Sequence, residues 1–266
     1  MSFTDILRAE FKLEYNDMLR RKSVLFMLIM YPYLFTLFAL FIGYAEGSPE
    51  VFVEKFGLNP VLYLITSSYI LMSILASVDV LLWRPLYDSE NGTLVYIISS
   101  PVNRLKYYIA LPFPRYTELL LMGATSILPV YVYYYGLEGV LLSLLVITLI
   151  AVGCVLMVPF AIFVAGVCHR VGESWRIINI VRPIVMILMG VYYPRFYIPL
   201  IGYVVGSLIP SSFIVEIIQR TLLRLESNTY LLLAIAFTLF FLYLPAGAWS
   251  IKAWEVKKVK EGVKIS

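Results

Sequence analysis

Four ionisable side chains lie within or beside long apolar stretches, where a charge is energetically costly and is therefore a candidate for function. Asp79 lies five residues before Arg84, about 8 Å along a helix, so ion translocation and a structural role near the membrane surface both stay open. Arg182 can extend its guanidinium to the lipid headgroups. Arg115 and Glu118 are spaced i, i+3, which predicts an ion pair on one helical face.

A second group consists of tyrosines near the ends of two apolar stretches. Its members are Tyr131, Tyr133, Tyr134, Tyr135, Tyr192, Tyr193 and Tyr197. Such a group is typical of the aromatic belt at a membrane–water interface. A role in substrate gating is the alternative, and Tyr134 and Tyr193 are the candidates for it.

Enzymatic chemistry is not indicated by the remaining residues. The chain has 1 His, and its 2 Cys, Cys154 and Cys168, lie in one apolar run, so the sequence offers no metal-ligand cluster. It contains neither a nucleophile–base set nor the G-x-x-x-x-G-K-[ST] loop that binds ATP. We therefore expect a chain that is not an enzyme and that holds no cofactor of its own.

The composition indicates the setting of these residues. Of 266 residues, 61% are hydrophobic and 14% charged, against about 45–50% and about 25% in ordinary soluble domains. With 21 Lys and Arg and 17 Asp and Glu, the chain cannot cover a water-facing surface of this size. This excludes a disordered chain, a coiled coil, a nucleic-acid-binding domain and a disulfide scaffold, and it predicts an integral membrane protein.

The apolar runs predict a single all-α transmembrane domain over residues 1–266, since a helix needs about 20 apolar residues to cross the hydrocarbon. Six spans are expected, at about 23–45, 56–83, 111–136, 139–168, 177–194 and 229–252. The first run follows 22 residues and has no small-residue cleavage site, so we expect no cleaved signal peptide.

A seventh apolar run, 196–215, is interrupted about every four residues by Pro199, Gly202, Gly206 and Pro210, which break a continuous helix. If this run does not cross, 17 Lys and Arg lie on one side and 4 on the other; if it crosses, the split is 14 to 7. The positive-inside rule favours the first arrangement. We expect a re-entrant helical hairpin before the sixth span, cytoplasmic N- and C-termini, and a location in the plasma membrane.

The N-terminal segment 1–22 is predicted to be an amphipathic helix lying in the membrane interface. An apolar stripe recurs at i+3 or i+4, and the segment ends in Arg20, Arg21 and Lys22 next to the first span, as interfacial helices often do. Ser2 and Asp5 resemble a capping box at its start.

The loop 84–104, RPLYDSENGTLVYIISSPVNR, joins the second and third spans and is too polar to cross the membrane. Asn91-Gly92 is a turn signal, and Thr93 can cap a short helix over Leu94–Ser99. Pro101 ends that helix, because the residue before a proline avoids helical dihedrals. The apolar face of the helix would comprise Leu94, Ile97 and Ile98.

Two parts of this loop, Glu90–Leu94 and Ser100–Arg104, resemble the E-x-G-T-L…[ST]-P-V-x-R pattern of the type-2 permeases of ABC (ATP-binding-cassette) transporters. The resemblance extends along the chain through the segment Gly190-Val191-Tyr192-Tyr193-Pro194, followed by Pro199 and Ile209-Pro210. Six spans, a short N-terminal interfacial helix and a pair of outer re-entrant helices match the same family.

The resemblance implies a membrane-spanning permease subunit, expected to be an exporter, whose short inner helix is the coupling helix to a separate cytoplasmic ATPase. The residues implied in coupling are Glu90, Gly92, Thr93, Leu94, Ile97, Ile98, Pro101 and Arg104. ATP and Mg would be bound by that ATPase. The other expected partners are a second permease copy or homologue and the lipid bilayer, and no nucleic acid.

Two other classes of function stay open beside this one. A stand-alone secondary transporter or channel is the alternative, and it would need deep paired charges or an inverted repeat, neither of which the sequence offers. A polytopic membrane enzyme would need a catalytic set of residues. The substrate stays undetermined.

Overall fold

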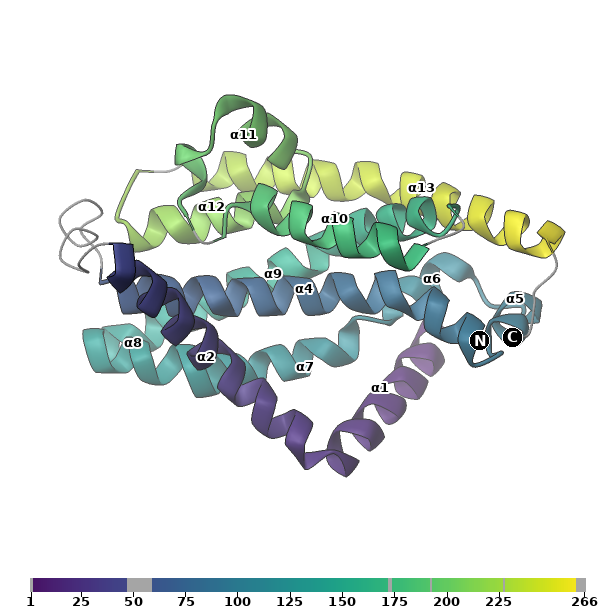
Figure 1. Ribbon diagram of the computed structural model, residues 1–266, viewed down its shortest axis with the longest axis horizontal. Helices are drawn as coiled ribbons and strands as arrows, with labels where there is room; N and C mark the ends of the chain where they lie inside the picture. Colours follow the sequence, from purple (N-terminus) through teal and green to yellow (C-terminus); the bar gives the residue numbers. More distant parts are fainter. Residues whose placement is uncertain (1, 47–58, 172–173, 192, 227, 262–266) are drawn as a thin grey trace.

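The computed structural model describes residues 2–46, 59–171, 174–191, 193–226 and 228–261, and within them the chain is helical without any strand (Figure 1). The helices are α1 (Phe3–Arg20), α2 (Lys22–Glu46), α4 (Pro60–Glu90), α5 (Leu94–Ser99), α6 (Arg104–Ala110), α7 (Phe113–Met122), η1 (Gly123–Ile127), α8 (Leu128–Tyr135), α9 (Leu137–Cys168), α10 (Ser174–Met189), η2 (Arg195–Tyr197), α11 (Leu200–Gly206), α12 (Pro210–Leu222) and α13 (Thr229–Glu261). The all-α prediction is thus confirmed for the described residues.

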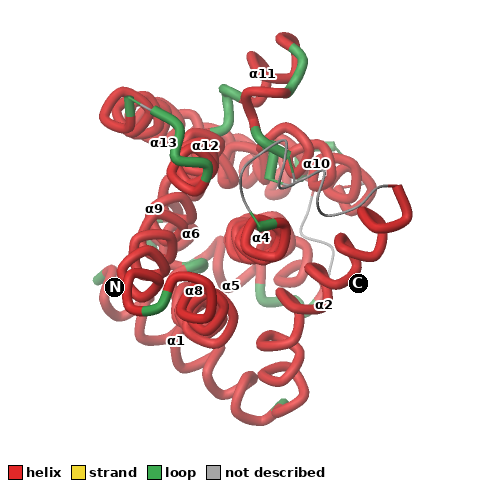
Figure 2. The backbone as a smooth tube through the Cα atoms, turned by 90° about the vertical axis from the view of Figure 1, so that its left-hand side faces the viewer, coloured by secondary structure: helices red, strands yellow, loops and turns green. Residues whose placement is uncertain are grey.

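Helix α4 forms the centre of the bundle. Seen end-on in Figure 2, it is surrounded by α2, α8, α9, α10 and α12, and its most apolar stretch is 78% buried. Its start is fixed because Asn59 Oδ1 accepts the Val61 N–H at 2.9 Å and Pro60 needs no partner at the first position. Small hydroxyl residues are buried along it and let neighbouring helices approach closely; they are Thr66, Ser67, Ser68, Ser73 and Ser77.

Helices α9 and α13 pack against each other along much of their length. A Cβ added at Gly166 of α9 would lie 2.6 Å from the backbone carbon of Ser250 on α13, so this approach requires a glycine. The Ser250 hydroxyl donates to the Phe163 carbonyl across the same contact, at 2.9 Å. Together with α4 and α12, this pair forms the core of the molecule.

Three helices of the described chain are long and apolar enough to cross a membrane, namely α4, α9 and α13. Helices α11 and α12 meet the same test only as a pair, and they are bent by 117° relative to each other. These findings agree with a membrane-embedded protein, whereas six spans stay a prediction. Helix α4 also runs to Glu90 and α13 to Glu261, past the predicted ends at 83 and 252, because polar residues continue both helices without a break.

The predicted third span, 111–136, is helical from Phe113 to Tyr135 and contains a π-helical turn. It is divided into α7, the π-helix η1 and α8. Pro129 has no N–H to offer the Thr125 carbonyl four residues earlier, which explains the irregular turn at this point. The Tyr33 hydroxyl of α2 donates to that carbonyl instead, at 2.5 Å, so the freed backbone group keeps a partner inside the bundle.

The N-terminal helix α1 begins with the predicted capping box. Ser2 N–H donates to the Asp5 carboxylate at 2.9 Å, and Asp5 N–H donates to the Ser2 hydroxyl at 3.2 Å. The helix packs against α6 and α7 through Ile6, which is 4% exposed, and through an edge contact between Phe3 and Phe113. Its position in the membrane interface stays a prediction.

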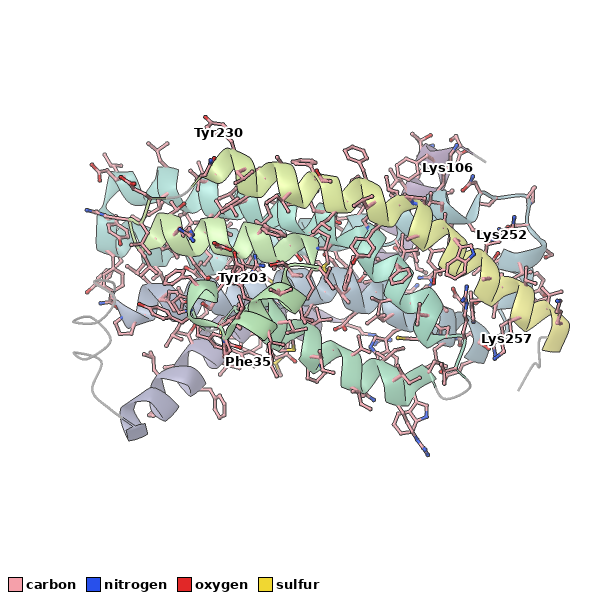
Figure 3. All side chains as sticks on the ribbon, turned by 90° about the horizontal axis from the view of Figure 1, so that it is seen from above. Phe35, Lys106, Tyr203, Tyr230, Lys252 and Lys257 are labelled. Carbon is pink, nitrogen blue, oxygen red and sulfur yellow. The ribbon has the colours of Figure 1, made fainter. Side chains whose placement is uncertain are left out.

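Several polar parts of the chain gather at one end of the bundle, which we call the α5 end. It comprises α5, α6, the start of α1 and the last turns of α4 and α13 (Figure 1). The labelled lysines Lys106, Lys252 and Lys257 lie there as well, whereas Tyr203 and Tyr230 lie in the other half of the molecule (Figure 3). The loop that carries the family resemblance therefore shares one end with this group of basic residues.

Candidate functional site

The candidate site is α5 with its flanking turns at the α5 end. Helix α4 ends at Glu90, where Asn91 caps it through N–H and Nδ2 bonds to the Tyr87 carbonyl. Gly92 then adopts a φ of +69°, with nothing within 4 Å of the position of an added Cβ. Here glycine is required by backbone conformation alone. Helix α5 follows over Leu94–Ser99, the range predicted from the sequence.

Thr93 does not act as predicted. It occupies the capping position of α5, but its hydroxyl makes no bond to the first turn of that helix. It points back instead, donating to the carbonyl and the Oδ1 of Asp88 at 3.2 and 3.0 Å. The helical dihedrals of Thr93, φ −75° and ψ −22°, explain this, because a capping side chain needs extended backbone to reach forward. Thr93 therefore ties α5 to the end of α4.

Asp88 links four elements of the site. It is 4% exposed, and it accepts from Thr93 and from Arg84 Nε at 3.1 Å and the Tyr107 hydroxyl of α6 at 3.4 Å. Arg84 in turn reaches Glu10 of α1 at 3.3 Å. The sequence reasoning missed Asp88, although its i, i+4 spacing from Arg84 is a recognisable signal for a helical pair.

The electrostatics of this group follow from its burial. Burial raises the pKa of Glu10, and the facing guanidinium of Arg84 opposes that rise. For Arg84 burial acts to lower the pKa, but Tyr107, Glu10 and Asp88 outweigh it and raise the pKa overall. Arg84 therefore stays cationic between two carboxylates, and the pairing holds α1 against α4.

Arg104 holds the other end of α5. Its NH2 donates to the Ile98 and Ser100 carbonyls at 2.6 and 3.2 Å, and its NH1 donates to Val102 at 2.8 Å. Its Nε forms an ion pair with Glu255 of α13 at 2.9 Å, and burial raises the pKa of that carboxyl although Arg104 lowers it. A cation at the last carbonyls of a helix is favourable. Arg104 thereby joins α5 to α13.

The two faces of α5 differ. Leu94 is 1% exposed, and Ile97 and Ile98 pack against the core, as the predicted apolar face requires. On the other side Tyr96 is 76% exposed, and Glu90 and Pro101 are also exposed. Beside α5, a groove of about 1020 Å³ runs between α1, α4, α5 and α6. Helix α5 thus has one face packed against the core and an exposed side, and contacts at both of its ends hold it in place.

The three candidate translocation residues are not brought together. Asp79 pairs with Arg182 of α10 at 2.9 Å, which gives each charge a partner. Tyr134 is exposed beside Tyr133, with ring centroids 5.2 Å apart. The Tyr193 hydroxyl donates to the Ile187 carbonyl at 3.1 Å. The predicted Arg115–Glu118 pair is confirmed at 2.8 Å.

The sequence reasoning also missed a buried charge cluster at η2 and α12. Glu216 is 1% exposed and pairs with Arg195 at 3.2 Å and with Arg220 at 2.9 Å. Arg195 is fully buried and lies over the Tyr203 and Phe213 rings, each 4.6 Å away. This cluster fixes α11 to α12. The sequence carries no signal for the Arg195–Glu216 pair, because its members lie 21 positions apart in different helices.

No protein-family model matches the chain, and neither does any curated protein or solved structure that was compared with it. Among the described residues no group of three His, Cys, Asp or Glu side chains could hold a metal ion. The geometry of the site is that of a short helix with an exposed side, linked to α1 and α4 through Asp88 and Arg84 and to α13 through Arg104.

Proposed function

We propose that this chain is the membrane-spanning permease subunit of an ABC transporter, with α5 as its coupling helix. The proposal rests on the contacts that fix both ends of α5. The helix is linked to α4 and α1 through Asp88 and to α13 through Arg104, and its Tyr96 side chain is exposed. A helix that is fixed at both ends transmits a displacement to the helices that it contacts, whereas a flexible loop would change its own conformation instead.

In this proposal a cytoplasmic ATPase binds the exposed side of α5, and its closure on ATP and Mg shifts α5. Arg104 passes the shift to α13, while Asp88 passes it to α4 and α1. No bond is made or broken in this chain. Six spans, cytoplasmic termini, a plasma-membrane location and export as the direction belong to the same proposal, as does a second permease copy or homologue that pairs with a second ATPase.

Photocrosslinking tests the proposal. Benzoylphenylalanine replaces Tyr96 in the full chain, expressed in its native membranes, and the matched control carries it at Tyr230, which is 87% exposed at the start of α13. We expect a crosslink to a soluble protein with an ATP-binding loop from position 96 and none from position 230. Crosslinks from position 96 to lipid alone would contradict the proposal.

A stand-alone secondary transporter is the second candidate, because the Asp79–Arg182 pair joins α4 to α10. Its test is transport in proteoliposomes driven by a proton or sodium gradient without any ATPase. Loss of such transport in Asp79→Asn, with Glu138→Gln as the control at an exposed carboxylate, would favour this candidate over the first.

A further inference from the structure

A small cavity at the α5 end has a strongly basic lining. It has a volume of about 80 Å³ and lies between the last turns of α4, the end of α9, the start of α10 and the last turns of α13. The lining residues are Pro85, Leu86, Ser89, His169, Arg170, Val171, Ser174, Trp254, Lys257 and Lys258. Of these lining residues, all from the described part of the chain, three are cationic at neutral pH and none is acidic.

Two of the three cationic side chains at the cavity, Arg170 and Lys258, have no carboxylate partner among the described residues. Arg170 lies over the Trp249 ring at 4.5 Å, and Lys257 donates to the Arg170 carbonyl at 2.7 Å. Like charges that line one small cavity repel one another. An anion between them would relieve that repulsion.

Two buried donors at the cavity have no acceptor. The Trp254 side chain is 1% exposed, and its indole N–H finds no hydrogen-bond partner in the part of the chain that the structure describes. The same holds for Nε of Arg170. A buried N–H without a partner is unfavourable and calls for an acceptor. Ser174 also begins the sixteen-residue helix α10, so the positive end of its dipole lies at the same place.

The volume of the cavity and its depth in the membrane limit which ligands it can bind. A water molecule takes about 30 Å³, so the cavity has the volume of two to three waters, enough for one tetrahedral anion. Lys257 and Lys258 lie five and six residues beyond the predicted end of the last span at 252, roughly 8–9 Å along the helix. This is the depth of the lipid headgroups, where basic pockets between helices bind anionic lipids.

We propose that this basic cavity binds a phosphate group, and that the headgroup of an anionic phospholipid supplies it. The His169 ring next to the cavity has its pKa lowered by burial and further by Lys258, in keeping with a positive potential there. The inference does not depend on an ATPase partner, so it can fail or succeed separately from the proposed function.

Binding is measured on the full chain in dodecyl maltoside. Phosphatidylglycerol, phosphatidylcholine or inorganic phosphate is titrated, and the shift of the thermal unfolding midpoint gives an apparent Kd for each probe. The double variant Lys257→Gln/Lys258→Gln is compared with Lys252→Gln/Lys260→Gln, which changes the charge of the same helix equally at exposed positions outside the cavity. A third variant, Trp254→Phe, keeps an aromatic ring at the cavity and removes the indole N–H donor.

We expect phosphatidylglycerol to bind, with a loss of roughly tenfold or more in Lys257→Gln/Lys258→Gln and under twofold in the control. Trp254→Phe should raise the apparent Kd for phosphatidylglycerol several-fold. The midpoint shift of this variant is measured from its own unliganded midpoint. Inorganic phosphate that binds as tightly as the lipid would support the phosphate site and overturn the lipid as its source. Equal losses in both double variants, or equal binding of phosphatidylcholine, would overturn the site itself.

Discussion

Replacing Asp88 with Asn removes the charge that joins four elements while keeping nearly the same shape. Thr93 can still bond to the amide oxygen, and Arg84 keeps Glu10 at 3.3 Å, so no cation is left alone. What is lost is the charge-assisted bond from Arg84 Nε at 3.1 Å and the anionic acceptor of Tyr107. A hydrogen bond to a charged group contributes about 1.5–3 kcal/mol, so we expect α5 and its turns to loosen by about 2–3 kcal/mol.

Native-state hydrogen exchange measures this loosening locally. The expected free-energy loss corresponds to roughly 30- to 150-fold faster exchange over residues 88–104, with α9 and the middle of α13 unchanged. Glu90→Gln is the matched control, because Glu90 is an exposed carboxylate two residues further along, and it should change exchange less than twofold. Equal exchange rates over residues 88–104 in Asp88→Asn and Glu90→Gln would refute the conclusion that Asp88 holds α5 in place.

Three further changes have predictable outcomes. Gly92→Ala places a side chain at φ +69° without any clash, so it should destabilise the turn by about 1–2 kcal/mol. This loss would be measured as faster hydrogen exchange in α5. Gly92→Asn should destabilise the turn less, because asparagine adopts positive φ more readily than alanine. Glu216→Gln leaves buried Arg195 without its carboxylate and should lower stability by about 3–5 kcal/mol, measured by thermal unfolding, whereas Glu226→Gln at an exposed position should not. His169→Gln should flatten the pH dependence of the unfolding midpoint.

The sign of the His169 effect follows from its environment. Burial, and to a lesser degree Lys258, lowers the pKa of this histidine, partly opposed by its bond to the Leu82 carbonyl. A lowered pKa means stability that is present above the unfolded value of about 6.5 and lost as pH falls through the folded value. Because this is the chain's 1 His, the difference between wild type and His169→Gln isolates it from Glu10 and Glu255. The midpoint of wild type minus that of His169→Gln should therefore increase as pH rises toward about 6.5, and a difference that decreases over this range would contradict this reasoning.

The sequence predicted local features best where one residue type dictates geometry. The turn at Asn91-Gly92 and the proline at 101 bound α5 because few residues can adopt those dihedrals. The Ser2–Asp5 box and the Arg115–Glu118 pair follow from spacing within one helix. By contrast, the partner of the Thr125 carbonyl in the π-helical turn before Pro129 is the hydroxyl of Tyr33, which lies 92 positions away in sequence.

Long-range pairing explains what sequence reasoning could not reach. Arg104 and Glu255 lie 151 positions apart, and no periodicity links them, yet together they tie α5 to α13. Glu216 lies four residues from Arg220 in sequence but 21 from Arg195, and only the fold places its carboxylate between the two arginines. Thr93 had the right type for a cap, but its backbone dihedrals turned its hydroxyl back toward Asp88.

Purification of the tagged chain in mild detergent from its native membranes tests the central claim most directly. The measured quantity is the stoichiometry of a soluble ATP-binding protein in the complex, for wild type, Tyr96→Ala and Tyr230→Ala. We expect an equimolar ATPase with wild type and with Tyr230→Ala, and its loss or marked reduction with Tyr96→Ala. Absence of any ATP-binding partner from wild type, or its full retention in Tyr96→Ala, would contradict the role assigned to α5.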